Sequence, residues 1–377
     1  MFKFTKLMKC GKLFLTLILV ILISSFIFKA IFYKSESIIP SPYSNLTGHW
    51  KFLRPPLRYD GSDGVLLSEK LNSPIWNISV YHNPLLPQPI CDPNQLYSLI
   101  IVVNSASYNF NKRNHIRSTW GTVPSHASNE TLKTFFMVGR SRNVTIEKLL
   151  MVESQIYQDI IMGDFLDTYY NNTIKTIYSH YWIHKMCTMN FLFKTDDDVY
   201  VNAIPLLENI KYINPKAILY AGLVLTNDRF VVRSEACIHP ITGYNSCKWA
   251  IERRVWPFSH HVKFARGLGV LLSNPALDLL LNNYKHIYGP LFHTDDSYVG
   301  FVFKRSSVSI CEVNGFYDDF AFIPYKDICL LNSAYAVHCN GKLCPPSLHT
   351  DAKKAWRACE RLNRLQEDIR SCQYSSD

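Results

Sequence analysis

Residues 191–202 read FLFKTDDDVYVN: a short apolar run, three consecutive aspartates and a second β-prone pair. The apolar run predicts a buried strand, and the acids then stand at its carboxyl end, where ligands bind in open α/β sheets. Adjacent carboxylates repel one another, so a divalent cation or backbone N–H groups must neutralise them. Oxygen ligands of this kind suit Mg²⁺ or Mn²⁺. We therefore expect a metal site that holds a phosphorylated substrate, with an acidic turn as the alternative.

The composition is that of a globular chain of 377 residues, 47% hydrophobic and 19% charged, long enough for one large domain or two ordinary ones. The formal net charge is +10, but the basic residues form no block and no nucleic-acid-binding signature is present. A nucleic-acid partner is therefore not expected, whereas anionic ligands and membrane surfaces are favoured.

An uncharged apolar run covers residues 13–28 and becomes long enough to cross a bilayer if Lys29 snorkels. Four lysines precede the run and two follow, which predicts a cytosolic N-terminus and a lumenal body. We expect residues 1–12 to be a cytosolic tail, 13–33 a transmembrane signal anchor and 34–95 a stem with loops. A cleaved signal peptide is the alternative, disfavoured because no A-x-A site follows.

Two further features fit a body inside the secretory pathway. All the N-x-S/T sequons follow the apolar run; they begin at Asn45, Asn77, Asn129, Asn143 and Asn171. All of the 11 cysteines except Cys10 also follow it, leaving an even number suited to disulfides. Cys237 and Cys247 can close a small loop. For the cysteines near the C-terminus zinc is the alternative, but Cys339 and Cys344 lack a second matched pair.

Strand-like and helix-like segments alternate from residue 96 onward. Buried strands are predicted at 97–106, 133–140, 158–165, 191–194 and 218–225. Helices are predicted at 112–121, 144–155, 169–186 and 203–213. This alternation predicts an α/β domain with a mostly parallel sheet. We place it at residues 96–345, followed by a cysteine-containing extension at 346–377.

Three motifs follow in the second half. Residues 265–275, ARGLGVLLSNP, place two glycines before an apolar run, typical of a close backbone approach to a ligand or of a bulge. Residues 293–303, HTDDSYVGFVF, carry a second acidic pair before a helix or strand. Residues 334–341, AYAVHCNG, end a short apolar run in a histidine, which is more often structural than a ligand.

Two acidic clusters that come together can divide the work of sugar transfer. A divalent ion on a diphosphate makes it a better leaving group, and a carboxylate across the pocket can take a proton from an attacking hydroxyl. These roles suit an inverting transfer of a sugar from a nucleotide diphosphate to an alcohol. Glycoside hydrolysis by two carboxylates needs no metal and stays open on chemical grounds.

Five motifs in order resemble those of the β-1,3-glycosyltransferases, the galactosyl- and N-acetylglucosaminyltransferases that use UDP-sugars. They are RNHIRSTWG (113–121), KTDDDVYVN (194–202), YAGLVL (220–225), WPFSHHVKFARGLGVLLS (256–273) and DDSYVG (295–300). The resemblance implies a GT-A type Rossmann-like nucleotide-sugar domain with a mostly parallel sheet, preceded by a single N-terminal transmembrane helix. It also implies a single-pass type II protein of the Golgi membrane.

The activity implied by the resemblance is hexosyl transfer in protein or lipid glycosylation, forming a β-1,3 linkage. The donor is a UDP-sugar, with galactose favoured over N-acetylglucosamine, and the acceptor is a glycan on a glycoprotein or glycolipid. The implied metal, Mn²⁺ or Mg²⁺, is assigned to Asp198, Asp196 and His338. Asp196 and Asp197 are expected to hold the donor ribose and to help orient the metal.

The resemblance makes Asp296 the catalytic base, with Asp295 beside it. Gly267 and Gly269 are expected to line the sugar and acceptor pocket. Arg117 matches a family position and is a candidate donor contact, although support of the first helix is the favoured alternative.

Departures from the family pattern bear on acceptor specificity and on the choice of sugar. Ser297 stands where the family usually has valine, Trp256 replaces a tyrosine, Leu268 interrupts the glycine run, and His260 and His261 lengthen the spacing before it. The acids are intact, so an active enzyme is expected.

Two alternatives of other classes remain. One is a phosphohydrolase that uses Asp196 and Asp198 as nucleophile and acid, which leaves the other motifs unexplained. The other is a lumenal glycan-binding pseudoenzyme, which would bind glycan without consuming the donor.

Overall fold

A computed structural model of the protein describes residues 88–89, 91–122, 130–226, 229–243, 245–284, 291–318 and 329–358. The chain divides into two compact units, Met1–Pro55 and Pro56–Asp377, and all the described residues belong to the second. The predicted tail, the anchor and nearly all of the stem lie outside the described residues. Within those residues, no helix combines the length and apolar character needed to cross a bilayer.

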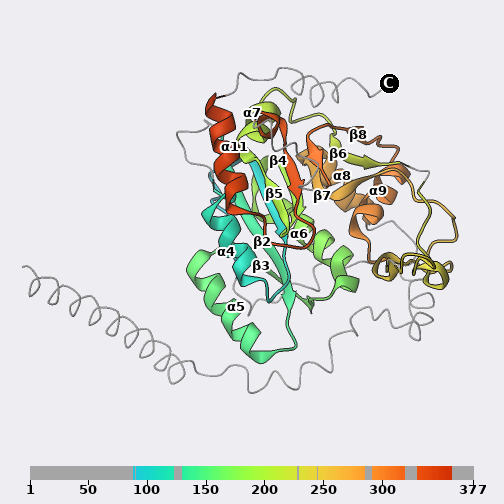
Figure 1. Cartoon of the computed structure of the whole chain (residues 1–377). Helices are drawn as coiled ribbons and strands as arrows, with labels where there is room; N and C mark the ends of the chain where they lie inside the picture. The colour runs from blue at the N-terminus through green and yellow to red at the C-terminus, as the bar shows by residue number, and fades with distance from the viewer. Residues whose placement is uncertain are drawn as a thin grey trace, which may run out of the picture. The chain divides into compact units, whose positions relative to one another are not determined.

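A seven-stranded sheet forms the centre of the second unit (Figure 1). In spatial order its strands are β3 (Ile160–Leu166), β2 (Leu132–Arg140), β1 (Leu96–Asn104), β4 (Thr188–Asp196), β7 (Phe264–Ser273), β6 (Tyr220–Leu225) and β8 (Cys311–Glu312). The first four strands are mutually parallel, whereas β7 runs antiparallel to both of its neighbours. The predicted α/β domain with a mostly parallel sheet is confirmed, with one reversed strand beside β4.

A three-stranded sheet lies at the end of β4. It consists of β5 (Val199–Val201), β10 (Ala336–His338) and β9 (Phe316–Tyr317), with β10 in the middle. The acidic stretch therefore passes from the large sheet into the small one.

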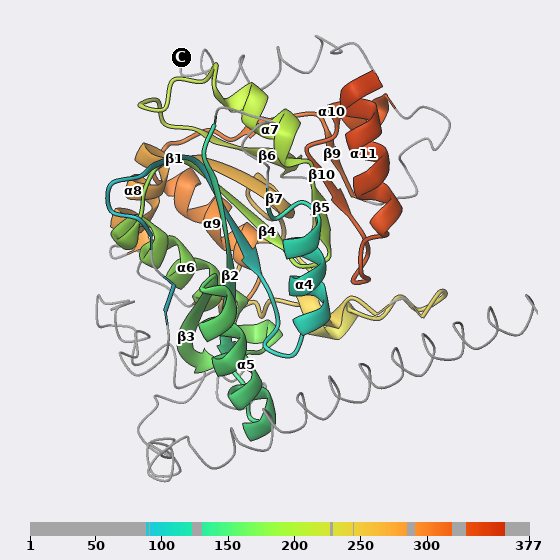
Figure 2. The ribbon, with the colours of Figure 1, turned by 90° about the vertical axis from the view of Figure 1, so that its left-hand side faces the viewer.

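Helices cover both faces of the large sheet, as the two views in Figures 1 and 2 show. One face carries α6 (Asn172–Met186), α8 (Asn274–Tyr284) and α9 (Asp295–Arg305). The other carries α4 (Phe110–Ser118), α5 (Val144–Tyr157), α7 (Ala203–Ile210), α10 (Leu330–Ser333) and α11 (Pro346–Ala358). Short 3₁₀ turns are η2 (Tyr169–Asn171), η3 (Ser234–Ala236) and η4 (Cys247–Trp249).

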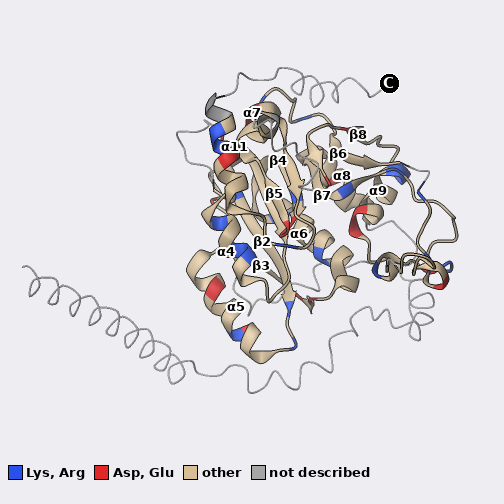
Figure 3. Cartoon of the chain, in the orientation of Figure 1, with Lys and Arg blue, Asp and Glu red and all other residues tan. Residues whose placement is uncertain are grey.

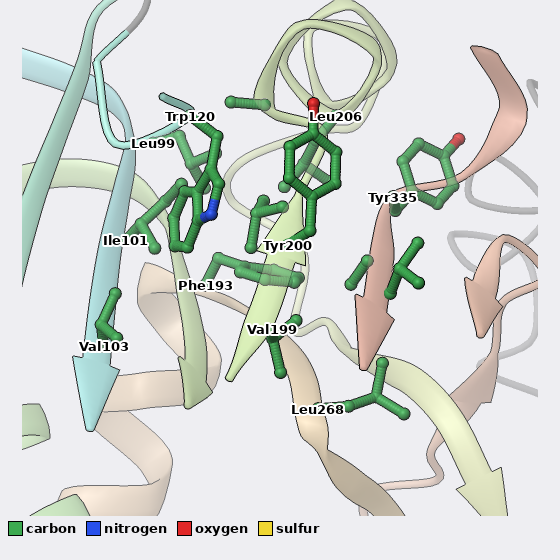
Figure 4. Close-up of a cluster of buried hydrophobic side chains, with 14 of the residues drawn as sticks. Leu99, Ile101, Val103, Trp120, Phe193, Val199, Tyr200, Leu206, Leu268 and Tyr335 are labelled. Atoms are coloured by element: carbon green, nitrogen blue, oxygen red, sulfur yellow. The ribbon is translucent and has the colours of Figure 1, made fainter. Parts of the chain in front are cut away.

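Side chains alternate along the strands and so contribute to two hydrophobic cores, one on each face of the sheet. In β1, Leu99, Ile101 and Val103 pack on the side of α4, together with Trp120 and Phe193 (Figure 4). The intervening residues of β1 pack on the side of α6. A strand that is buried on both faces reads as a continuous apolar run, which explains why β1 and β4 stand out in the sequence.

The predicted boundary at residue 345 does not coincide with the edge of the core. Helix α11 opens the predicted extension, yet its Leu348, Ala352 and Ala355 pack into the same core as β1. At least the start of the extension thus belongs to the α/β unit.

Disulfides follow the predicted use of cysteine. Cys237 pairs with Cys247, which closes the small loop that their short separation allows, and Cys339 pairs with Cys344, where zinc was the alternative. The sequence did not predict the bond from Cys91 to Cys187, which joins the segment before β1 to the end of α6.

Two sequons differ in accessibility. Asn143 is exposed and its side chain accepts hydrogen bonds from the first backbone N–H groups of α5. Asn171 is buried, with 1% of its surface exposed, and its Nδ2 donates to the carbonyl of Leu166 at 2.8 Å. A glycan at Asn171 is incompatible with the folded unit.

Candidate active site

Strand register brings the two predicted acidic clusters together. Asp196 ends β4 beside Asn104, the last residue of β1. Since β7 is antiparallel and pairs Val270 with Lys194, the residues just before Val270 pass the carboxyl end of β4. The backbone N–H of Gly267 donates to Asp296 Oδ2 at 3.3 Å.

The position of Gly267 shows how close the acids are. A Cβ added to Gly267 would lie 3.5 Å from Asp196 Oδ2 and 3.8 Å from Asp296 Oδ2. Acids 100 residues apart in the chain therefore flank one small space. The reading in which both clusters are unrelated solvated turns does not fit this arrangement.

Lys194 joins the two clusters. Its Nζ lies 3.0 Å from Asp196 Oδ1 and 2.9 Å from Asp295 Oδ2, and its side chain is 4% exposed. Thr176 on α6 donates to the same oxygen of Asp295 at 2.6 Å. Sequence reasoning missed this role of Lys194, although a lysine within a buried apolar strand is itself a signal, because a buried charge needs a partner.

The two acids at the start of α9 have different electrostatics, although both lie in its first turn (Figure 3). Burial disfavours the charge of Asp295, but Lys194 and Thr176 outweigh it and lower the pKa of that carboxyl. Burial and the charge of Asp295 raise the pKa of Asp296 to about 6. Asp295 thus stays ionised as a structural anion, whereas Asp296 is poised to accept a proton near neutral pH.

Asp198 and His338 meet across the small sheet. His338 pairs with Val199 in the β5–β10 register, and its Nε2 lies 3.4 Å from Asp198 Oδ2. The Nδ1 of His338 lies 3.1 Å from the carbonyl of Asp318, which can only accept, so Nδ1–H donates to it and Nε2 faces Asp198. Burial opposes the charge of Asp198, yet the hydrogen bond and charge of His338 lower its pKa.

This pair fits a divalent cation. One carboxylate oxygen and one imidazole nitrogen suit Mn²⁺, and a metal that also binds substrate phosphates needs only one or two protein carboxylates. The third predicted ligand, Asp196, has one oxygen bonded to Lys194, and its side chain is 44% exposed. No group of three or more His, Cys, Asp or Glu residues has metal-binding spacing in the part of the chain that the structure describes.

A match to a known family covers the strands and helices that carry these acids. Residues 111–314, more than half of the chain, match the family model described as Galactosyltransferase. The chain belongs to the galactosyltransferase family.

Named relatives agree with this membership. Beta-1,3-galactosyltransferase 1 of Mus musculus is 28% identical over 233 residues, which are 60% of this chain and 65% of that protein. The chain therefore spans less than two thirds of the length of this relative. Beta-1,3-galactosyltransferase 5 of Homo sapiens is 29% identical over 241 residues, 64% of this chain and 73% of that protein.

Similarity to solved structures is low. Mouse xyloside xylosyltransferase 1 in its apo form aligns with a TM-score of 0.31 and 11% identity, covering 67% of this chain and all of that one. The galactosyltransferase LgtC with donor and acceptor sugar analogs aligns with a TM-score of 0.33 and 8% identity, covering 71% of this chain and 99% of that one.

Within this galactosyltransferase-family chain, the middle aspartate of the acidic stretch is bonded to side chains of another segment. Asp197 Oδ2 accepts hydrogen bonds from Ser105 at 2.7 Å and from Asn109 at 2.8 Å, and Lys112 Nζ lies 2.9 Å from its Oδ1. Ser105 and Asn109 belong to the segment between β1 and α4, and Lys112 to the start of α4. These bonds favour a structural role for Asp197 and give no support to its predicted contact with the donor ribose.

Arg117, the other candidate donor contact, is bound to acidic residues of neighbouring segments. Its guanidinium pairs with Glu153 and Asp159, each at 2.7 Å, and stacks on the ring of Tyr157. The neighbouring family position, Arg113, is fully buried against Glu153. Both arginines fix α4 to α5, so the alternative of support for the first helix is the one that these contacts favour.

Gly269 faces a core instead of the pocket. A Cβ at this position would come within 2.6 Å of the Phe316 ring and 2.7 Å of the Phe193 ring. The glycine is therefore explained by packing, and these contacts give no support to its predicted role in lining the sugar and acceptor pocket.

Proposed function

We propose that this protein is an inverting, metal-dependent hexosyltransferase of GT-A type that moves galactose from a UDP-sugar to a hydroxyl of a glycan acceptor. The linkage is β-1,3, and the acceptor glycan is carried by a protein or a lipid. Transfer of N-acetylglucosamine is the alternative within the same mechanism. Family membership and the similarity to beta-1,3-galactosyltransferases support this class of reaction.

One observation carries the mechanism: Asp196 and Asp296, both within the match to the family model, flank the space beside Gly267. Asp296 takes the proton of the acceptor hydroxyl, whose oxygen then attacks the anomeric carbon as the bond to the diphosphate breaks. Lys194 pairs with Asp196 and with Asp295, the neighbour of Asp296 in the chain, and so ties the two acidic clusters together without touching the reacting atoms.

In this mechanism the donor diphosphate binds at Asp198 and His338. A bound Mn²⁺ or Mg²⁺ would neutralise charge on the leaving UDP. Asp198 and His338 would hold the ion, with Asp196 as the third ligand when its exposed oxygen turns toward them. The alternative, a phosphohydrolase, would use Asp196 and Asp198 but assigns no role to the acids of α9.

We further propose that the protein is anchored in the Golgi membrane by residues 13–33, as a single-pass type II protein with its α/β unit in the lumen. Support comes from the lysines around the apolar run and from disulfides in the α/β unit, because disulfides persist in oxidising compartments.

A donor screen tests the proposed function. The full chain in detergent is given several UDP-sugars, with and without a panel of β-linked acceptors, in Mn²⁺ or in EDTA. We expect UDP release from UDP-galactose that needs both metal and acceptor. Release without an acceptor would indicate a hydrolase, and UDP binding without any release would favour the glycan-binding pseudoenzyme.

A further inference from the structure

An exposed aromatic surface lies beside the proposed base and has no part in the mechanism above. It is formed by Tyr169 and Tyr170 of η2 and by Trp249 of η4, and we call it the aromatic surface. Tyr169 is 37% exposed and Tyr170 40% exposed. Half-exposed aromatic rings at the mouth of a catalytic site are suited to packing against a sugar ring, because each offers a broad apolar face.

His293 ties this surface to the acids of α9. The centroid of its ring lies 5.7 Å from that of Tyr169 and 5.2 Å from that of Tyr170, and the residue is 3% exposed. Three residues further along the chain is Asp296. The electrostatics agree with this placement: burial raises the pKa of Tyr169, and the charges of Asp296 and Asp295 raise it further.

Lys248 places a positive charge on the same surface. Its Nζ lies 5.8 Å from the ring centroid of Tyr169 and 4.4 Å from that of Trp249. Lys248 is exposed, and among the described residues no carboxylate lies within ion-pair distance of it. Aromatic faces hold an ammonium group in place while leaving its hydrogen-bond donors available to a ligand.

The position of Lys248 is fixed by its backbone. Its carbonyl lies 2.7 Å from His293 Nε2, so the imidazole donates to it. The preceding residue, Cys247, is joined to Cys237, and Ser246 N donates to the carbonyl of Cys237 at 2.8 Å. The turn that carries Lys248 is therefore held by the disulfide at the preceding residue and by His293 at the carbonyl of Lys248 itself. These contacts give the ammonium a defined location relative to Asp296.

The aromatic surface lies on the acceptor side of the site. It adjoins α9, because the ring of His293 contacts those of Tyr169 and Tyr170 and stands just before the helix that carries Asp296, the proposed base for the acceptor hydroxyl. The diphosphate belongs with Asp198 in the proposed mechanism, so the group that meets Tyr169 is the acceptor.

We propose that Lys248, with Tyr169 and Trp249, forms a subsite for an acceptor sugar that carries a negative charge on or next to the accepting ring. The proposal rests on the proposed function for the identity of the acceptor side. Its chemical class is a sugar with a carboxylate or a sulfate. The sugar ring packs on the aromatic surface and the anion binds the ammonium of Lys248.

The test compares matched acceptors on the full chain. The probes are p-nitrophenyl β-galactoside, the corresponding galacturonide and the galactoside 6-sulfate, and the readout is the ratio of kcat/KM for each charged acceptor to that for the neutral one. We expect a ratio above one. We expect Lys248→Met to lower the ratio about fivefold, in the range of a partly exposed ion pair, and Lys248→Arg to retain most of it. Preference for only one of the charged acceptors would tell carboxylate from sulfate.

The matched control is Arg253→Gln, an exposed cation of the same segment that pairs with Glu235. It should leave the ratio unchanged. A ratio of one in the unmodified chain, or an equal effect of Lys248→Met on charged and neutral acceptors, would overturn the proposal.

A binding measurement separates this proposal from the proposed function. Saturation-transfer NMR with UDP and Mg²⁺ reports affinity for methyl galacturonide and methyl galactoside without turnover. Tighter binding of the galacturonide that is lost in Lys248→Met supports the subsite even if no transfer occurs. Equal binding of both sugars would contradict it.

Discussion

The end of β4 and the segment between β6 and β7 both reach the candidate active site, but they are fixed in different ways. Asp196 and Lys194 stand on a strand whose pairing with β1 and β7 sets their positions. Lys248 and Trp249 stand in a segment of 3₁₀ turns and isolated bridges, closed by a disulfide. The comparison indicates a division of labour, in which the sheet and the start of α9 hold the acids of the mechanism and the irregular segment selects the acceptor.

Removal of the proposed base should have the largest effect. Asp296→Asn keeps the shape of the side chain but cannot accept the proton, so we expect kcat to fall about 10²- to 10⁴-fold. UDP affinity, measured by calorimetry with Mn²⁺, should stay within about twofold because Asp198 and His338 are intact. The control is Asp278→Asn, an acid with a 59% exposed side chain on α8. Retained turnover in Asp296→Asn would remove it as the base.

Weakening the proposed metal pair should have the next largest effect. His338→Gln removes the nitrogen that faces Asp198, so we expect the Mn²⁺ concentration for half-maximal activity to rise about tenfold or more. The control is His184→Gln at the end of α6, far along the chain from this pair. An unchanged metal requirement would assign His338 to folding instead of metal binding.

Opening two of the disulfides, one at a time, should separate an effect on stability from an effect on acceptor binding. Cys91→Ser with Cys187→Ser opens a bond across 96 residues, and we expect unfolding to become easier by about 4 kcal/mol. Cys237→Ser with Cys247→Ser opens a bond across 10 residues beside Lys248, and we expect mainly a rise of about threefold to tenfold in acceptor KM. Thermal unfolding and acceptor kinetics on both variants check this. The reverse pattern would break the proposed division of labour.

A contact between two departures from the family pattern should give the smallest effect. His261 Nδ1 lies 2.8 Å from Ser297 Oγ, and Ser297 N donates to Asp296 Oδ1 at 2.7 Å. Ser297→Val removes the hydroxyl and leaves the half-buried imidazole of His261 without this partner, which costs about 1 kcal/mol. We expect kcat/KM to fall about fivefold. Ser297→Thr should restore most of it; if both variants behave alike, the hydroxyl is irrelevant.

The position of a residue along its strand explains which parts of the site could be predicted from the sequence. A buried apolar run followed by acids fixes the carboxyl end of a parallel strand, so β4 and Asp196 were accessible to sequence reasoning. For residues 293–303 the sequence pattern does not decide between a helix and a strand. In the structure this segment contains α9, with both acids in the first turn. The N-terminus of a helix favours negative charge, which gives a physical reason for this outcome.

What escaped prediction depends on contacts between distant segments. Nothing local distinguishes Gly269, which packs on aromatic rings, from Gly267, which approaches the acids, because both precede the same apolar run. Likewise Asp197 differs from its neighbours only in that Ser105 and Lys112 face it from another strand and helix. His293, which donates to the backbone carbonyl of Lys248, is likewise distant from Lys248 in the sequence.

The structure of the product tests the central claim most directly. The full chain is incubated with UDP-galactose, whose sugar is α-linked, and a β-galactoside acceptor in Mn²⁺, and the purified product is analysed by NMR. We predict a single new sugar with a β anomeric proton, attached at oxygen 3 of the acceptor, because one displacement driven by Asp296 inverts the anomeric carbon. An α-linked product, or free galactose with no linked product, would contradict the account.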